Sequence, residues 1–506
     1  MRKLAATLTL SLAVALALST ARAADVATPQ VTGPIEGGER GRPFTSSVVD
    51  LAASGYVEEE FFLDGTATSY APAPGTALGR DGRWNLVEDG GAPYRTRILV
   101  RRPEATSRFN GTVLVEWLNV TGGFDIDAVW ARIQTEVLRE GYAWVGVSAQ
   151  RASVNGPPVL EGVSDPLTTW DPERYGTLSI PDDSASYDIF SQAGAVLGRE
   201  RPRKSGSPDP LDGLPVRRLL AIGASQSAHR LASYVDGVHP LVRVFDGFLV
   251  VGRFGRGASL GTGLDAPNPL LLRTDLATPV FTVNSESEAL AHFAARQPDT
   301  ESLRYWEVAG AAHQDTYVDA VIDAETSRDL GFPLPPCSPP ANSMPFQYVL
   351  NAALDHLNRW AAGVADGRRG GRRLRTLAPG AQDASRVIRN ARTSAAPPSF
   401  PPIAISGEPP AIERDGFGNA KGGIRLPQLR VPTAQYGPVG TPEVLRCDLR
   451  GFTIPFSDES LAALYPDHAT YVRRVDAATS TALRSGFVLP PDAREIRRDA
   501  VTAPIP

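Results

Sequence analysis

The chain of 506 residues is 42% apolar and 21% charged, values close to those of globular proteins. This composition excludes disordered, collagen-like and coiled-coil chains, and the 47 glycines and 44 prolines indicate a fold rich in turns. The formal net charge of −5 argues against nucleic acid as a partner.

The N-terminus predicts a secretory signal peptide over residues 1–23. Arg2 and Lys3 precede an apolar stretch over 4–18, and residues 21–23 form an A-x-A cleavage site. The stretch is too short to serve as a stable membrane anchor. We therefore expect a protein that is exported to the periplasm or to the extracellular medium, with no stable insertion into a membrane.

The first part of the mature chain predicts strands of two kinds. Residues 56–63 and 94–100 alternate in part between apolar and polar side chains, which is typical of antiparallel strands with one exposed face. Residues 112–118 and 143–147 are more continuously apolar, as in the buried parallel part of a sheet. Between these two strands, residues 126–141 predict a helix that ends at a glycine.

Residues 152–214 are rich in Pro, Gly and Asp and show little periodicity. We interpret this stretch as an insertion placed to cover a site. After it, strands and helices alternate, which favours a mainly parallel sheet built from βαβ units. The predicted strands lie over 216–222, 242–251, 279–283 and 303–308, and the predicted helices over 227–235, 289–296 and 346–362.

The basic run 368–373 marks a boundary, which we interpret as a solvated linker. It divides a body over 24–375 from a C-terminal extension over 376–506, in which helices are predicted over 459–464 and 468–486. Two cysteines in an exported chain allow one intramolecular disulfide. We therefore expect Cys337 and Cys447 to pair and to hold the extension on the body.

Residues 219–228, which read LLAIGASQSA, predict a buried strand, a sharp turn at a serine and the start of a helix. This is the sequence context of a nucleophile elbow. The motif is G-x-S-x-S in place of G-x-S-x-G, but its last position needs only a small side chain. Small residues at Gly223 and Ser227 permit the strained turn that would present the Ser225 hydroxyl above the sheet. Ser225 is thus the predicted nucleophile.

A serine nucleophile needs a histidine base that is oriented by a carboxylate. Of the six histidines, His313 alone lies in a flexible loop directly after a predicted parallel strand, at the edge of the sheet where sites form. Glu288 and Glu286, at the end of the preceding strand, are the two candidates for this carboxylate. The spacing from the strand favours Glu288, and Glu286 remains the alternative. The order Ser, acid, His is that of α/β-hydrolases.

Two backbone N–H groups are predicted to stabilise an oxyanion. One is that of Gln226, the residue after the nucleophile, and the other that of Val120 or Thr121 in the loop after the strand 112–118. The sequence contains no CxxC, HExxH or clustered His and Cys set, so we expect neither a metal nor another cofactor.

With these motifs in place, the chain resembles the α/β-hydrolase-domain family of exported bacterial proteins over nearly all of its mature length. The segments that carry the resemblance are 115–123, 223–227, 306–313 and 418–427. The resemblance implies an α/β-hydrolase fold, with a mostly parallel sheet flanked by helices, and hydrolysis of esters or related acyl compounds without a cofactor. Relatives often carry Asp at the position of Glu288 and Glu at that of Glu286, which leaves the choice of acid open.

The resulting hypothesis is a serine hydrolase that cleaves small-molecule carboxylic esters through an acyl-enzyme on Ser225, with no protein partner implied. Acyl transfer or lactone cleavage by the same residues is the enzymatic alternative, and a non-catalytic binding protein on a hydrolase fold is the other. The glycine-rich segment 418–427 is interpreted either as a loop packed on the body or as a pocket wall in which Arg425 faces an anionic group.

Overall fold

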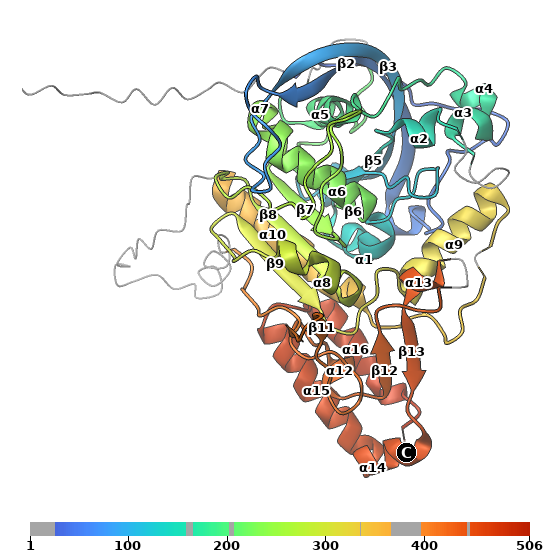
Figure 1. Cartoon of the computed structure of the whole chain (residues 1–506). Coiled ribbons are helices and arrows are strands. Elements are labelled where there is room, and N and C mark those ends of the chain that lie inside the picture. Colours follow the sequence, from blue (N-terminus) through green and yellow to red (C-terminus); the bar gives the residue numbers. More distant parts are fainter. Residues whose placement is uncertain are drawn as a thin grey trace, which may run out of the picture.

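The computed structural model describes residues 26–157, 165–201, 207–333, 335–365, 396–442 and 446–505 (Figure 1). The predicted signal peptide, the basic run 368–373 and the boundary at 375 lie outside the described residues. None of the helices in the described part of the chain combines the length and the apolar character that crossing a membrane requires.

A nine-stranded sheet with the order β1-β2-β3-β5-β4-β6-β7-β8-β9 forms the centre of the molecule. The first three pairings, β1–β2, β2–β3 and β3–β5, are antiparallel, and all later ones are parallel, which confirms the predicted directions. Residues 94–100 are nearly all buried, so the exposed face predicted for that strand is wrong. All side chains of β4, β5, β7 and β8 are buried, because helices cover both faces of a parallel sheet. The strands are β1 (Gln30–Thr32), β2 (Tyr56–Pro72), β3 (Leu86–Pro103), β4 (Thr112–Trp117), β5 (Ala143–Val147), β6 (Arg218–Ala224), β7 (Gly247–Val251), β8 (Val280–Ser285) and β9 (Leu303–Val308).

Helices follow most of the strands and pack on the sheet. Helix α1 contacts α9 and α10, α6 packs on β6 and β7, and α8 packs on β8 and β9. The helices of this part are α1 (Trp130–Glu140), α2 (Arg151–Val154), α3 (Leu167–Trp170), α4 (Pro172–Tyr175), α5 (Ser186–Leu197), α6 (Gln226–Ser233), α7 (His239–Val242), α8 (Glu286–His292), α9 (Thr316–Leu330) and α10 (Phe346–Ala365), with the short segments η1 (Ala52–Ser54), η2 (Thr106–Arg108), η3 (Tyr234–Val238) and η4 (Phe293–Ala295).

Several predicted boundaries shift in the structure, and two of the shifts have a cause in local contacts. The helix predicted over 126–141 begins only at Trp130, because the buried carboxylate of Glu116 in β4 accepts the N–H groups of Val129 at 2.7 Å and Trp130 at 2.9 Å. The strand predicted over 242–251 is β7 alone, because its first residue ends α7, a short helix with a proline in its first turn.

The predicted insertion holds α5, a regular helix that its sequence periodicity does not indicate. Polar side chains of α5 are buried against β2, where Asp188 accepts the N–H of Thr68 at 2.8 Å and Gln192 donates to the carbonyl of Thr66 at 2.8 Å. Because these polar groups are satisfied inside the fold, α5 shows no clear apolar stripe in the sequence.

The C-terminal extension forms the end of the molecule opposite the long, curved β2–β3 pair (Figure 1). Ile424 forms a parallel bridge with Val308 at the edge of the main sheet, so the extension continues that edge. Its elements are β10 (Ile405–Ser406), β11 (Ala411–Ile412), α12 (Pro427–Arg430), β12 (Ala434–Gly437), α13 (Cys447–Arg450), β13 (Phe452–Pro455), α14 (Asp458–Leu464), α15 (His468–Arg484) and α16 (Pro490–Thr502).

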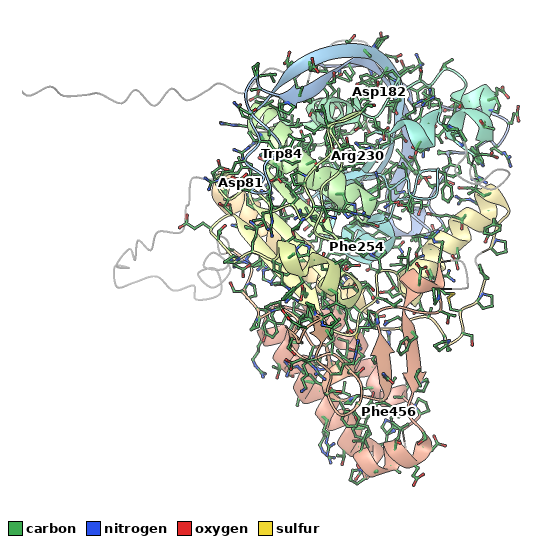
Figure 2. The ribbon with its side chains drawn as sticks, viewed as in Figure 1. Asp81, Trp84, Asp182, Arg230, Phe254 and Phe456 are labelled. Carbon is green, nitrogen blue, oxygen red and sulfur yellow. A yellow bond between two sulfur atoms is a disulfide. The ribbon has the colours of Figure 1, made fainter. Side chains whose placement is uncertain are left out.

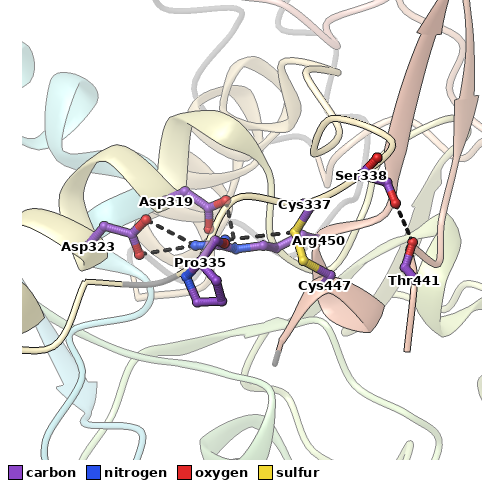
Figure 3. The surroundings of a disulfide bond; sticks show 8 residues. All are labelled: Asp319, Asp323, Pro335, Cys337, Ser338, Thr441, Cys447 and Arg450. Carbon is purple, nitrogen blue, oxygen red and sulfur yellow. Dashed lines mark hydrogen bonds and ion pairs between the residues drawn. A yellow bond between two sulfur atoms is a disulfide. The ribbon is translucent and has the colours of Figure 1, made fainter. Parts of the chain in front are cut away.

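The predicted disulfide joins Cys337, which follows α9, to Cys447, the first residue of α13 (Figure 3). Next to it, the Arg450 guanidinium binds the carboxylates of Asp319 and Asp323 on α9, each at 3.0 Å. The disulfide and these ion pairs therefore fasten α13 to the body of the protein.

Replacing both cysteines with alanine is expected to lower the free energy of unfolding by about 4–5 kcal/mol, since the bond closes a loop of 110 residues and restricts the unfolded chain. Urea unfolding of the double variant and of the wild type measures the difference. Reducing the wild type with dithiothreitol should bring its midpoint to that of the variant. Equal midpoints before reduction would contradict the prediction.

Candidate active site

Ser225 occupies the turn between β6 and α6 with a strained backbone. Its φ of 61° and ψ of −118° lie in a region of backbone conformation that residues other than glycine rarely adopt. Its N–H donates to the carbonyl of Val251 at the end of the neighbouring strand β7, at 2.9 Å. Strain of this kind is kept where the surrounding structure holds it, and it is concentrated at functional sites.

The small residues on both sides of Ser225 close the turn. A Cβ atom on Gly223 would lie 3.0 Å from the Leu231 side chain and 3.2 Å from the carbonyl of Ser227, so helix and strand approach too closely for a larger residue. The Ser227 hydroxyl donates to the carbonyl of Ala224 at 2.9 Å and accepts its N–H at 3.2 Å. The second serine of G-x-S-x-S thus fastens the turn, beyond being merely small.

His313 lies in the loop after β9 and meets Glu288 on α8. Its Nδ1 atom is 2.6 Å from Oε1 of Glu288, whose side chain is completely buried. A Cβ atom on Gly252, a residue with a φ of 62°, would lie 3.1 Å from the imidazole, so a glycine leaves room for the ring. Phe254, labelled in Figure 2, packs against the same ring with 5.2 Å between centroids. The orientation of His313 is therefore fixed from two sides.

Glu288 also caps the helix that carries it. Its Oε2 atom accepts the N–H of Ser285 at 2.7 Å and its hydroxyl at 2.8 Å, which completes a capping box. Burial acts to raise the pKa of Glu288, but the charge of His313 and the hydrogen bonds from His313 and Ser285 outweigh it and hold the pKa below its ordinary value. The S-x-x-E spacing is a signal in the sequence that points to this position.

Glu286 makes different contacts, although it lies only two residues earlier. Its Oε1 atom binds the Arg414 guanidinium of the extension at 2.9 Å, and Oε2 accepts the N–H of Gly310 at 2.7 Å. Burial raises the pKa of Glu286, and the nearby Arg414 opposes that rise. One carboxylate oxygen of Glu286 therefore binds the extension, and the other binds the loop after β9.

The loop after β4 lies beside the turn at Ser225. The Asn119 side chain donates to the carbonyl of Ala224 at 3.0 Å and accepts the N–H of Thr121 at 2.9 Å. The N–H of Val120 points at Oε1 of Gln226 over 3.5 Å, a long and weak contact. Of the two N–H groups predicted from this loop, that of Thr121 is already engaged, whereas that of Val120 is bound only weakly.

The predicted insertion contacts the start of α6 through polar side chains. The Gln226 amide donates to Gln150 at 2.8 Å, and the Gln150 amide donates to Asp183 of the insertion at 3.1 Å. Asp183 also binds Arg230 on α6 at 2.7 Å; Arg230 is labelled in Figure 2. The insertion thus positions Gln226 through a chain of polar side chains.

A cavity of about 200 Å³ opens beside Ser225. It is smaller than the pockets that bind drug-sized ligands, whose volumes are about 300–1,000 Å³. Its wall includes residues of α1, α9 and the extension that the sequence did not identify. No local sequence pattern identifies them, because they come together only when the chain folds. The lining residues are Asn119, Thr121, Gly122, Ile126, Ala128, Arg132, Ser225, His313, Gln314, Ile322, Arg446 and Leu449.

The lining of the cavity bears on two sequence interpretations. No described residue of the predicted insertion 152–214 lines it; the extension supplies Arg446 and Leu449 in its place. Arg425 does not line it either, because its guanidinium binds Asp415 at 2.6 Å and the carbonyls of Ala420 and Leu429. The segment 418–427 is therefore a loop packed on the body.

Within the described ranges, no group of three or more His, Cys, Asp or Glu side chains is placed to hold a metal ion. A serine at a strained turn and an imidazole bound to a buried carboxylate line the same cavity. This set suits nucleophilic attack on a carbonyl carbon.

Three solved structures resemble parts of this chain. They are an esterase from the fungus Rhizomucor miehei (11% identity, covering 60% of this chain and 85% of that one, TM-score 0.30), a glucuronoyl esterase from Solibacter usitatus (12%, 54% and 83%, TM-score 0.26) and the esterase Est22 (13%, 64% and 84%, TM-score 0.28). None of the curated proteins compared has a sequence that matches this chain.

The sequence pattern of the alpha/beta hydrolase domain family matches residues 31–376 and 380–498. The match includes the C-terminal extension as well as the sheet, and it confirms the fold class and the family resemblance predicted from the sequence. Since it spans nearly all of the chain after residue 31, the chain belongs to the alpha/beta hydrolase domain family.

Proposed function

We propose that the protein is a serine hydrolase that cleaves carboxylic esters through an acyl-enzyme on Ser225. The observation that carries the proposal is the shared cavity of Ser225 and His313, in which His313 is bound at 2.6 Å to the buried Glu288. Family membership supports hydrolysis in general, and the site supports the serine-based route.

The first step is the transfer of the Ser225 proton to His313. With Nδ1–H donated to Glu288, the free Nε2 atom of His313 accepts the hydroxyl proton while Oγ attacks the ester carbonyl. The imidazolium that forms is stabilised by the Glu288 carboxylate, whose lowered pKa keeps it ionised at neutral pH. His313 then gives the proton to the departing alcohol.

The oxyanion of the tetrahedral intermediate lies between the N–H groups of Gln226 and Val120. The N–H of Gln226 is the first of α6, where helix geometry leaves it without an intrahelical partner. The weak contact of Val120 with the Gln226 side chain is readily exchanged for an oxyanion, which accepts a much stronger hydrogen bond. Water then hydrolyses the acyl-enzyme, with His313 again acting as base.

A fluorophosphonate probe tests the proposal directly, because it reacts with activated serines only. We expect stoichiometric labelling of the folded protein at Ser225, identified by mass spectrometry of the labelled peptide. Heat-unfolded protein is the control and should remain unlabelled, since the activation depends on His313 and Glu288. A folded protein that resists the probe would favour the non-catalytic binding protein.

The disulfide supports our proposal that the protein is exported. Such bonds persist in the periplasm and outside the cell, whereas cytosolic thiols are kept reduced.

A further inference from the structure

Two guanidinium groups line the cavity beside Ser225, and neither forms an ion pair with any residue in the described ranges. Arg132 on α1 is only 5% exposed and donates to two carbonyls, those of Ala128 and His313, the latter at 2.6 Å. Its Nε atom is buried and has no partner among the described residues. Arg446, just before α13, donates to the side-chain oxygen of Gln314 at 2.9 Å. Both cations thus bind only neutral acceptors.

Most other buried arginines in the described part of the chain form ion pairs; Arg253, which donates to the carbonyls of Arg256 and Leu270, is an exception. Arg97 binds Glu60 at 2.8 Å and Asp125 at 2.9 Å, and Arg101 binds Glu58 at 2.8 Å together with Asp127. A buried charge without a counter-charge is costly, so proteins normally supply one. Arg132, which is buried, and Arg446, which is half-buried, depart from this pattern in the wall of the cavity beside Ser225.

The acidic groups that act electrostatically on Arg132 and Arg446 form their direct contacts with other partners. Glu288 binds His313, Asp315 caps α9 through the N–H of Val318 at 3.0 Å, and Asp319 and Asp323 bind Arg450. Burial and the charges of Arg450 and Arg132 lower the pKa of Arg446, whereas the charges of Asp319 and Asp323 oppose that fall. An anion in the cavity would therefore give Arg446 and Arg132 a direct charged partner, in addition to the neutral acceptors that they now bind.

The extension holds Arg446 in place by several contacts. Its backbone has a φ of 63°, a left-handed conformation that is unfavourable for arginine. The next residue, Cys447, forms the disulfide. In addition, Gln314, the residue directly after His313, donates its N–H to the carbonyl of Leu449 at 2.9 Å. The disulfide and the chain after the base thus set the position of Arg446 in the cavity wall.

We propose that this cavity selects small esters that carry a carboxylate, which Arg446 and Arg132 bind while Ser225 attacks the ester bond. The inference rests on the proposed function and adds a substrate class to it. The apolar side chains of Ile126, Ile322 and Leu449 would hold the short hydrocarbon part that separates the two groups. The volume of about 200 Å³ restricts that part to a few carbon atoms or one ring.

Two matched ester pairs test the proposal. The first is 4-acetoxybenzoate against its methyl ester, with the charge on the alcohol side, and the second is monomethyl glutarate against dimethyl glutarate, with the charge on the acyl side. We expect the wild type to prefer the anionic member of at least one pair, measured as kcat/KM from chromatography of the products.

Arg446→Gln should lower kcat/KM for the preferred anionic ester by roughly 10- to 100-fold, as for loss of a hydrogen bond to a charged group, and change the neutral ester less than about threefold. Arg446→Lys keeps the charge and should retain part of the preference. Arg430→Gln, at an exposed arginine of the same extension, is the matched control and should match the wild type.

The possible outcomes separate this inference from the proposed function. Two results would overturn the inference alone. One is hydrolysis of the neutral esters without any preference for an anionic one, and the other is an equal loss of kcat/KM for both esters of a pair in Arg446→Gln. Labelling of Ser225 by the fluorophosphonate without turnover of either anionic ester also overturns it alone. Absence of both labelling and turnover overturns the proposed function and the inference with it.

Discussion

Ser225→Ala is expected to lower kcat for 4-nitrophenyl acetate by on the order of 10⁴- to 10⁶-fold. The substitution removes the only atom that forms the acyl-enzyme, while the Gln226 and Val120 N–H groups stay in place. A small residual rate above that of water alone should therefore persist through oxyanion stabilisation. Release of 4-nitrophenolate, followed by absorbance, measures both rates.

The fold of this variant should remain intact. Alanine at a φ of 61° carries the same backbone strain as serine, so the turn gains or loses little. The thermal midpoint, measured by circular dichroism, is expected to stay within a few degrees of that of the wild type. Unchanged turnover in a folded Ser225→Ala protein would remove Ser225 from the mechanism.

The second large effect is expected for Glu288→Gln, a loss of on the order of 10⁴-fold in kcat. The amide no longer stabilises the imidazolium and no longer selects the His313 tautomer with a free Nε2. Glutamine still fits the capping box with Ser285, so the start of α8 should be preserved. Steady-state kinetics with 4-nitrophenyl acetate, together with the unfolding midpoint, separates loss of catalysis from loss of structure.

Glu286→Gln is the matched control from the same helical turn. It removes the charge that faces Arg414 but keeps an oxygen for the N–H of Gly310. We expect it to lower the free energy of unfolding by about 1–3 kcal/mol and to leave kcat within a few-fold of the wild type. A large loss of kcat in Glu286→Gln, with Glu288→Gln active, would transfer the role of the acid to Glu286.

Much of the site was predictable because its signals are local. The turn at Ser225 is a run of small residues between a strand and a helix, and His313 follows a strand directly, so both positions are marked by their neighbours in the chain. The alternation of strands and helices likewise predicted a mainly parallel sheet. Such signals depend on the backbone geometry of a few consecutive residues.

Local spacing favoured Glu288 over Glu286 but could not decide between them. Both lie in the first turn of α8, and two residues of a helix point about 200° apart around its axis. One side chain therefore meets His313 while the other meets Arg414, and only the packing of α8 against the loop after β9 determines which.

The sequence by itself thus determined the fold class, the predicted nucleophile and the predicted base. The tertiary structure alone decided which acid contacts His313 and what forms the cavity wall. Arg132 comes from α1 and Arg446 from an extension that is distant in the chain, and they meet because the disulfide and the ion pairs of Arg450 hold α13 beside α9. Contacts between residues so far apart leave no periodicity or motif in the chain, because they arise only when separate elements pack together.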